Sequence, residues 1–185
     1  MTSPTHDDAS AQELLVSLSR ELFQTETSAS RHCRREAGRL GDAPPALALR
    51  AVADHADAVL RDLPALAQRT GMPVSRGGRL TGELFSQLRD KLFDMMIDSD
   101  RSYRGTMLGC RHGIDLMHLL KHLATVQGKL ELDQFCEAWL NTRCVLVQRL
   151  EDELAWFAKH PQQALELARH PFAAGSRARA HHVSP

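Results

Sequence analysis

Glycine and proline are sparse in this chain, and the stretches between them are long and helical in pattern. The 185 residues contain 11 glycines and 8 prolines, which gather in a few short segments. Between these segments apolar residues recur at helical spacing, and alternating β-branched runs are almost absent. Because a half-buried strand needs that alternation, the pattern restricts the chain to an all-α fold.

Cap and breaker residues set the expected helix boundaries. Ser10 followed by Glu13 predicts the start of a first helix, Pro44 suits the first turn of a second, and Pro64 predicts a kink inside it. A break near residues 98–100 divides a helical stretch that is too long for one rod beside shorter neighbours. We expect helices over residues 10–40, 44–70, 80–97, 100–127 and 131–159, a loop over 71–79, and a short appendage over 161–169.

Long helices joined mostly by short connections predict an antiparallel four-helix-type bundle with an additional short helix. The length suits a single domain, which we place at residues 10–170, between a disordered amino terminus (1–9) and a disordered, basic tail (171–185). The strongest apolar stripe lies on the last long helix and is expected to be core. It consists of Leu132, Phe135, Cys136, Trp139, Leu146, Val147, Leu150, Leu154 and Phe157.

The charge and apolar pattern exclude several classes of protein. Lys+Arg number 23 and Asp+Glu also 23, and this balance disfavours a nucleic-acid binder with a strong basic field. No apolar run approaches the length that spans a bilayer, and no secretory signal is visible, so we expect a cytoplasmic protein that does not enter membranes.

The four cysteines are far apart in the sequence and form no C-x-x-C pair. They are Cys33, Cys110, Cys136 and Cys144, and each falls on or beside an apolar helix face. We therefore expect buried free thiols rather than a zinc or redox motif.

Charged residues interrupt the apolar faces of three expected helices. One hypothesis is an ion-pair network between facing helices that fixes their register; another is a polar pocket in which an arginine pair holds a carboxylate or phosphate and His112 titrates near neutral pH. In a third, the charged groups reach outward to solvent. The candidate ligand-binding residues are Glu26, Glu36, Arg101, Tyr103, His112 and Arg143.

Gly105, Gly109 and Gly113 recur at four-residue intervals on one expected helix. Such a strip lets another backbone, a ligand or a partner helix approach closely. Tyr103 is one turn away and is expected to line the same groove.

The expected architecture resembles ferritin-like four-helix bundles, and His32-x-x-x-Glu36 and His118-x-x-x-His122 resemble ligand pairs of hemerythrin-like bundles. This resemblance implies a bundle that binds a metal or a small anion in its polar interior. A metal set of Asp115, His118 and His122 is possible by helical spacing, although cationic neighbours make a solvated polar face the simpler reading.

The segment from His118 through Lys121 to Gly128 and Cys136 resembles the phosphohistidine helix and following turn of histidine phosphotransfer domains. The resemblance implies that His118 accepts a phosphoryl group and that Lys121 helps to neutralise it. This sequence has His122 where that family usually has glycine.

No Walker A pattern, no G-x-S-x-G and no cysteine with an evident histidine partner occurs in the sequence. The sequence therefore favours a binding or regulatory protein over an enzyme and indicates no cofactor. We expect a homodimer or a complex with a protein partner, with the phosphotransfer module and the metal- or anion-binding bundle as the alternatives.

Overall fold

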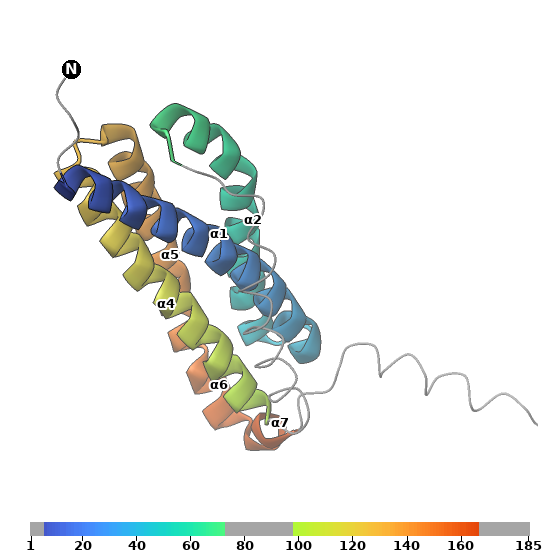
Figure 1. Cartoon of the computed structure of the whole chain (residues 1–185). Coiled ribbons are helices and arrows are strands. Elements are labelled where there is room, and N and C mark those ends of the chain that lie inside the picture. The colour runs from blue at the N-terminus through green and yellow to red at the C-terminus, as the bar shows by residue number, and fades with distance from the viewer. Residues whose placement is uncertain (1–5, 73–97, 167–185) are drawn as a thin grey trace, which may run out of the picture.

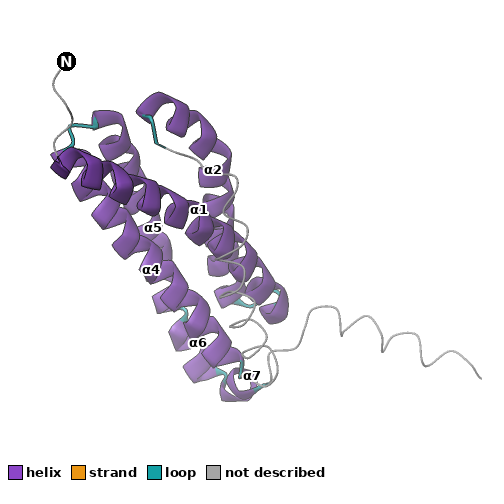
Figure 2. Cartoon of the chain, in the orientation of Figure 1, coloured by secondary structure: helices purple, strands orange, loops and turns teal. Residues whose placement is uncertain are grey.

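The computed structural model describes residues 6–72 and 98–166, and the long elements within these ranges are all α-helices (Figure 2). Their bounds are α1 His6–Leu40, α2 Pro44–Thr70, α4 Ser99–Val126, α5 Leu130–Asp152, α6 Leu154–Lys159 and α7 Pro161–Leu165. The all-α prediction is confirmed for the described ranges. The expected helix over 80–97, almost all of the expected loop and the carboxyl-terminal tail lie outside them.

Most of the expected helix ends are confirmed. α2 begins at Pro44 and ends at Thr70, and it continues past Pro64. Gly41, Gly71 and Gly128 follow α1, α2 and α4 with φ of 65°, 67° and 66°, the left-handed conformation that glycine adopts without a steric penalty.

Two of the predicted helix boundaries were wrong. α1 begins at His6 rather than Ser10, because no glycine or proline in residues 6–9 stops the helix from extending toward the amino terminus. The expected last helix is two helices, α5 and α6, separated by a turn at Glu153. Sequence periodicity continues through this turn because the apolar stripe resumes at Leu154 in nearly the same phase.

The four long helices contact one another in a closed ring: α1 packs against α2 and α4, and α5 packs against the same two helices. Short turns make α1–α2 and α4–α5 antiparallel pairs. Ser102 near the start of α4 bonds Glu36 near the end of α1, and Lys129 before α5 bonds Thr70 at the end of α2, so these two pairs also run antiparallel. α2 therefore ends at one end of the assembly and α4 begins at the other, beside α7 (Figure 1).

The interior contains two hydrophobic clusters, one toward each end of the assembly. The first includes Leu22, Leu120 and Trp139, and the second includes Leu49, Tyr103 and Phe157. On each long helix the chain passes from one cluster to the other near the middle. The expected stripe of the last helix is confirmed as core, since six of its nine residues are buried and Phe135, Leu146 and Leu154 pack against the clusters.

Candidate functional site

A buried ion pair lies where the two hydrophobic clusters meet. Glu26 on α1 and Arg143 on α5 have side chains that are 0% and 1% exposed, and Arg143 Nη2 donates to Glu26 Oε2 at 2.6 Å. The guanidinium carbon of Arg143 also lies 4.8 Å from the ring centre of Trp139, in cation–π contact. The ion-pair hypothesis is therefore confirmed for these two residues, which join helices that are not neighbours in the ring.

Burial dominates the electrostatics of this pair. It raises the pKa of the Glu26 carboxyl group above its ordinary value, and the charge of Arg143 opposes that shift only in part. His55 on α2 is half-buried nearby, and burial together with Arg143 lowers its pKa to about 4. His55 is therefore uncharged at neutral pH. We call Glu26, His55 and Arg143 the polar layer.

The polar layer has unused hydrogen-bonding atoms. Among the described residues, Glu26 Oε1, Arg143 Nε, Trp139 Nε1 and His55 Nδ1 have no hydrogen-bond partner. The layer is nevertheless closely packed, because Gly113 on α4 leaves room only for Thr25 and the Trp139 ring: an added Cβ would lie 3.1 Å from Thr25 Cγ2.

Glu36 is the second buried carboxylate on α1, and it has local partners. Ser102 on α4 donates to its Oε2 at 2.6 Å, and Arg39, one turn further along α1, donates at 3.2 Å. Burial again raises the pKa of this carboxyl group. Glu36 does not contact the polar layer in any described interaction, so the expected single network is two separate sites.

Arg101 and His112 are not interior residues, and this part of the expected network was wrong. Arg101 is exposed, and His112 is exposed with its Nε2 3.0 Å from Oε1 of Glu21. The sequence predicted both residues on a face with Leu108, Leu116, Leu119 and Leu123, but Leu108 and Leu119 are 67% and 47% exposed. The buried residues of α4 are Ser99, Tyr103, Met107, Cys110, Gly113, Leu116, Met117, Leu120 and Ala124.

Tyr103 does not line a groove. It is fully buried, and its hydroxyl donates to the Leu150 carbonyl at 2.9 Å. The prediction that Gly105, Gly109 and Gly113 form a close-packing strip was also wrong. A Cβ at Gly105 or Gly109 would meet nothing within 4 Å, and of these three glycines only Gly113 is tightly packed.

The outward face of α4 carries a stripe of exposed residues at alternating spacings of four and three. This heptad-type spacing is the one that helices use to pack along their length. We call these residues the outer stripe: Arg101, Gly105, Leu108, His112, Asp115, Leu119, His122 and Val126.

His118 is exposed beside the outer stripe, as a phosphoacceptor would need to be. Lys121, its expected helper, is held by α5: its Nζ donates to Asp133 Oδ1 at 2.8 Å and lies 3.4 Å from Glu137. These contacts raise the pKa of Lys121 and keep it charged. Asp115, His118 and His122 are all exposed, and no group of three or more metal-ligating side chains is assembled within residues 6–72 and 98–166.

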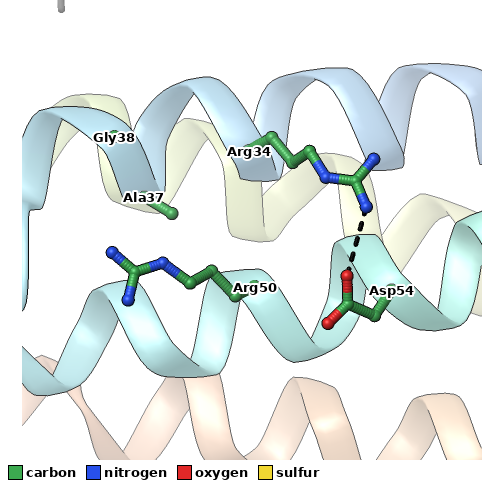
Figure 3. Close-up of a pocket in the computed structure, with 5 residues that line it drawn as sticks. All are labelled: Arg34, Ala37, Gly38, Arg50 and Asp54. Carbon is green, nitrogen blue, oxygen red and sulfur yellow. Dashed lines mark hydrogen bonds and ion pairs between the residues drawn. The ribbon is translucent and has the colours of Figure 1, made fainter.

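Two surface hollows accompany these features. One, of about 350 Å³, lies between α1 and α2 and is lined by Arg34, Ala37, Gly38, Arg50 and Asp54 (Figure 3). Arg34 is paired with Asp54 at 3.1 Å, and Arg50 donates to the Gly41 carbonyl at 2.5 Å. The other, of about 370 Å³, lies between α2 and α5 near Arg69, which is paired with Glu131. The charges in both hollows are largely satisfied within the chain.

Sequence reasoning missed His55, Ser102 and Arg39 as partners of the interior charges. His55 had a usable signal, because it interrupts the apolar face of α2 between Val52 and Val59. Three cysteines are buried as expected, but Cys144 is exposed. All four are free thiols.

No family model matches the chain, and neither a curated protein nor a solved structure matches it. Within the described ranges, no helix is both long and apolar enough to cross a bilayer.

Proposed function

We propose that the four long helices form an antiparallel four-helix bundle that works by binding rather than by catalysis. The closed ring of antiparallel contacts supports the bundle. One connection that joins opposite ends of a bundle also occurs in ferritin-like folds, which supports the resemblance in architecture. Free thiols at all four cysteines fit the reducing cytoplasm as the location.

The outer stripe of α4 is the observation that carries a binding function. In the interior, Glu26 pairs with Arg143 and Glu36 with Arg39 and Ser102. The outer stripe, by contrast, exposes two large leucines on one line of a helix. An amphipathic face of this kind is typical of a surface that binds another helix.

The partner that fits the outer stripe is a second copy of this chain. The spacing of the stripe is the same from both ends and Leu108 takes the position that matches Leu119, so two α4 helices related by a two-fold axis can pair antiparallel. Leu108 then packs on Leu119 of the second copy, and His112 meets Asp115 of the second copy. Gly105 and Gly109 leave space for the larger His122 and His118 of that copy.

The mass of the full chain in solution tests this proposal. Light scattering coupled to size exclusion is expected to give the mass of a dimer for the wild type and of a monomer for Leu108→Glu. Leu47→Glu is the matched control, because Leu47 on α2 is 55% exposed and lies away from the stripe. A monomeric wild type, or equal effects of the two leucine substitutions, would overturn the proposal.

A charge swap tests the expected register. His112→Asp places an aspartate opposite Asp115 of the second copy at both symmetry-related contacts and should weaken the dimer, because like charges at an interface are unfavourable. Adding Asp115→His restores the opposite pairing and should recover most of the affinity. If the double variant is no tighter than His112→Asp, the pairing of these residues is wrong.

The phosphotransfer module stays a second candidate because His118 is exposed on a helix of the bundle. Incubation with a phosphorylated receiver domain is expected to label the wild type and not His118→Gln. Lys121 is already bonded to Asp133, so Lys121→Ala should reduce labelling only slightly if that ion pair persists during transfer. Equal labelling of wild type and His118→Gln would remove this candidate.

A metal or small anion in the interior is the remaining alternative. A metal would bind the unpartnered Oε1 of Glu26, whereas an anion would accept from the unpartnered Nε–H of Arg143. Elemental analysis of the purified full chain tests the metal version. A stoichiometric metal that is lost in Glu26→Gln would support this version, and the absence of metal from a sample purified without chelator would exclude it.

A further inference from the structure

Two buried thiols from different helices touch each other beside the polar layer. Cys33 on α1 and Cys110 on α4 are 0% and 3% exposed, and their sulfur atoms are 3.8 Å apart. The residues are 77 positions apart in the sequence, so the fold alone brings them together.

The geometry is close to that of a disulfide. A disulfide bond is about 2.05 Å long and joins residues on neighbouring backbone segments, so the sulfur atoms must approach by less than about 2 Å. α1 and α4 pack against each other as antiparallel neighbours, and the two sulfur atoms lie in the contact between these helices.

The surroundings distinguish the two thiols. The hydrogen bond between the two thiols and the positive charge of Arg143 lower the pKa of Cys110, whereas the same hydrogen bond and burial raise the pKa of Cys33. Glu26 opposes the effect of Arg143 on both thiols. Cys136 offers a contrast, since burial and the charge of Asp133 raise its pKa to about 12 and Lys121 opposes them only in part.

We propose that Cys33 and Cys110 form a reversible disulfide when hydrogen peroxide oxidises the protein. The Cys110 thiolate attacks one peroxide oxygen, the O–O bond breaks, and the leaving hydroxide takes a proton to become water. The Cys33 sulfur then attacks the sulfenic sulfur of Cys110, and the S–O bond breaks with loss of a second water. Two thiols and one peroxide give one disulfide and two waters, and a dithiol reductant reverses the change.

Hydrogen peroxide suits this site because it is small and uncharged. The half-buried ring of His55 lies 6.0 Å from that of Trp139, which in turn contacts Arg143, so the polar layer is close to the surface on this side. Local opening of the helices provides the remaining access.

Peptide mapping of the full chain tests the proposal. A Cys144→Ser background removes the exposed thiol without touching the core. After peroxide treatment and alkylation, the expected result is a Cys33–Cys110 cross-linked peptide that a dithiol reductant abolishes. Retention of both thiols in their alkylated form, at peroxide doses that oxidise Cys144 in the wild type, would overturn the proposal.

Single variants test the order of the two steps. Dimedone, which traps sulfenic acids, should label Cys110 in Cys33→Ser and should not label Cys33 in Cys110→Ser. Circular dichroism verifies that each variant is folded, and Cys136→Ser is the matched control that keeps the cross-link. The oxidised wild type should also unfold at a higher temperature than the reduced protein, because the bond closes a long loop. Equal dimedone labelling of the two variants, or an unchanged unfolding temperature in a cross-linked sample, would contradict the assignment.

Discussion

The polar layer and the outer stripe of α4 both contain charged side chains and histidine, but the two regions differ in how far these side chains are exposed to solvent. In the polar layer, Glu26 and Arg143 are fully withdrawn from water and bonded to each other across the middle of the assembly. In the outer stripe, His112 and Asp115 are exposed, and His112 pairs at the surface with Glu21, whose side chain is 43% exposed. The difference shows that a charged residue on a helix cannot be assigned to the interior or the surface until the positions of the neighbouring helices are known.

The two regions also differ in what a lost partner costs. A buried charge that loses its partner keeps its full desolvation penalty, whereas an exposed charge regains water. Substitutions in the polar layer should therefore change the free energy of unfolding, and those in the outer stripe should change association instead.

Arg143→Met should give the largest effect on stability. It leaves the Glu26 carboxylate buried and unpaired, and breaking one member of such a pair costs about 3–5 kcal/mol. Denaturant unfolding measures the change. Arg111→Met is the exposed control, because Arg111 pairs with Glu151 at the surface, where an ion pair is worth roughly 0–1 kcal/mol. Similar losses in the two variants would remove the distinction between the regions.

The His55 ring should make the polar layer sensitive to acid. Its pKa of about 4 in the folded state lies below the ordinary 6.5, so the unfolded state binds the proton more tightly. The contribution is complete above pH 6.5 and is lost as the pH falls toward 4. It amounts to roughly 1–2 kcal/mol once the solvent-accessible half of the ring is allowed for.

The comparison of wild type with His55→Gln isolates this contribution. Glu26 and Glu36 have raised pKa values and act in the opposite direction, losing stability as the pH rises above their ordinary value of 4.5. Both glutamates are present in both proteins, so their effect largely cancels in the difference. The stability of the wild type relative to His55→Gln should decrease as the pH is lowered from 6.5 to 4.5. A constant difference would show that Arg143 and burial do not depress the His55 pKa.

Substitution of two glycines of α4 by alanine should give the smallest difference in stability, because it compares an open position with a packed one. In the Leu108→Glu background, where the proposed dimer contact is removed, Gly109→Ala adds a Cβ into empty space and should stabilise the protein by about 0.5–1 kcal/mol through helix propensity. Gly113→Ala places the Cβ 3.1 Å from Thr25 and should lose that gain or become destabilising. Thermal unfolding of both variants measures the difference, and equal stabilisation would show that Thr25 moves away freely.

Helical periodicity and breaker residues were enough to predict the helix class and most helix ends, because these depend on local sequence. An interior ion-pair network that includes Glu26 and Arg143 was one of three hypotheses, since both residues interrupt apolar faces, but the sequence did not show that these two pair with each other. Arg101 and His112 were misplaced because the leucines that marked their expected face do not share one environment: Leu116 is buried, whereas Leu108 and Leu119 are exposed. The contact between Cys33 and Cys110 depends on the packing of α1 on α4, and no local pattern encodes it.

The central claim is that each of these two buried charges is stabilised mainly by the other. A double-mutant cycle on Glu26→Leu and Arg143→Met tests this claim most directly. Each single substitution should destabilise the protein strongly, and the double variant should be more stable than either single one, with a coupling free energy of at least about 2 kcal/mol. Additive losses in the double variant would contradict the account.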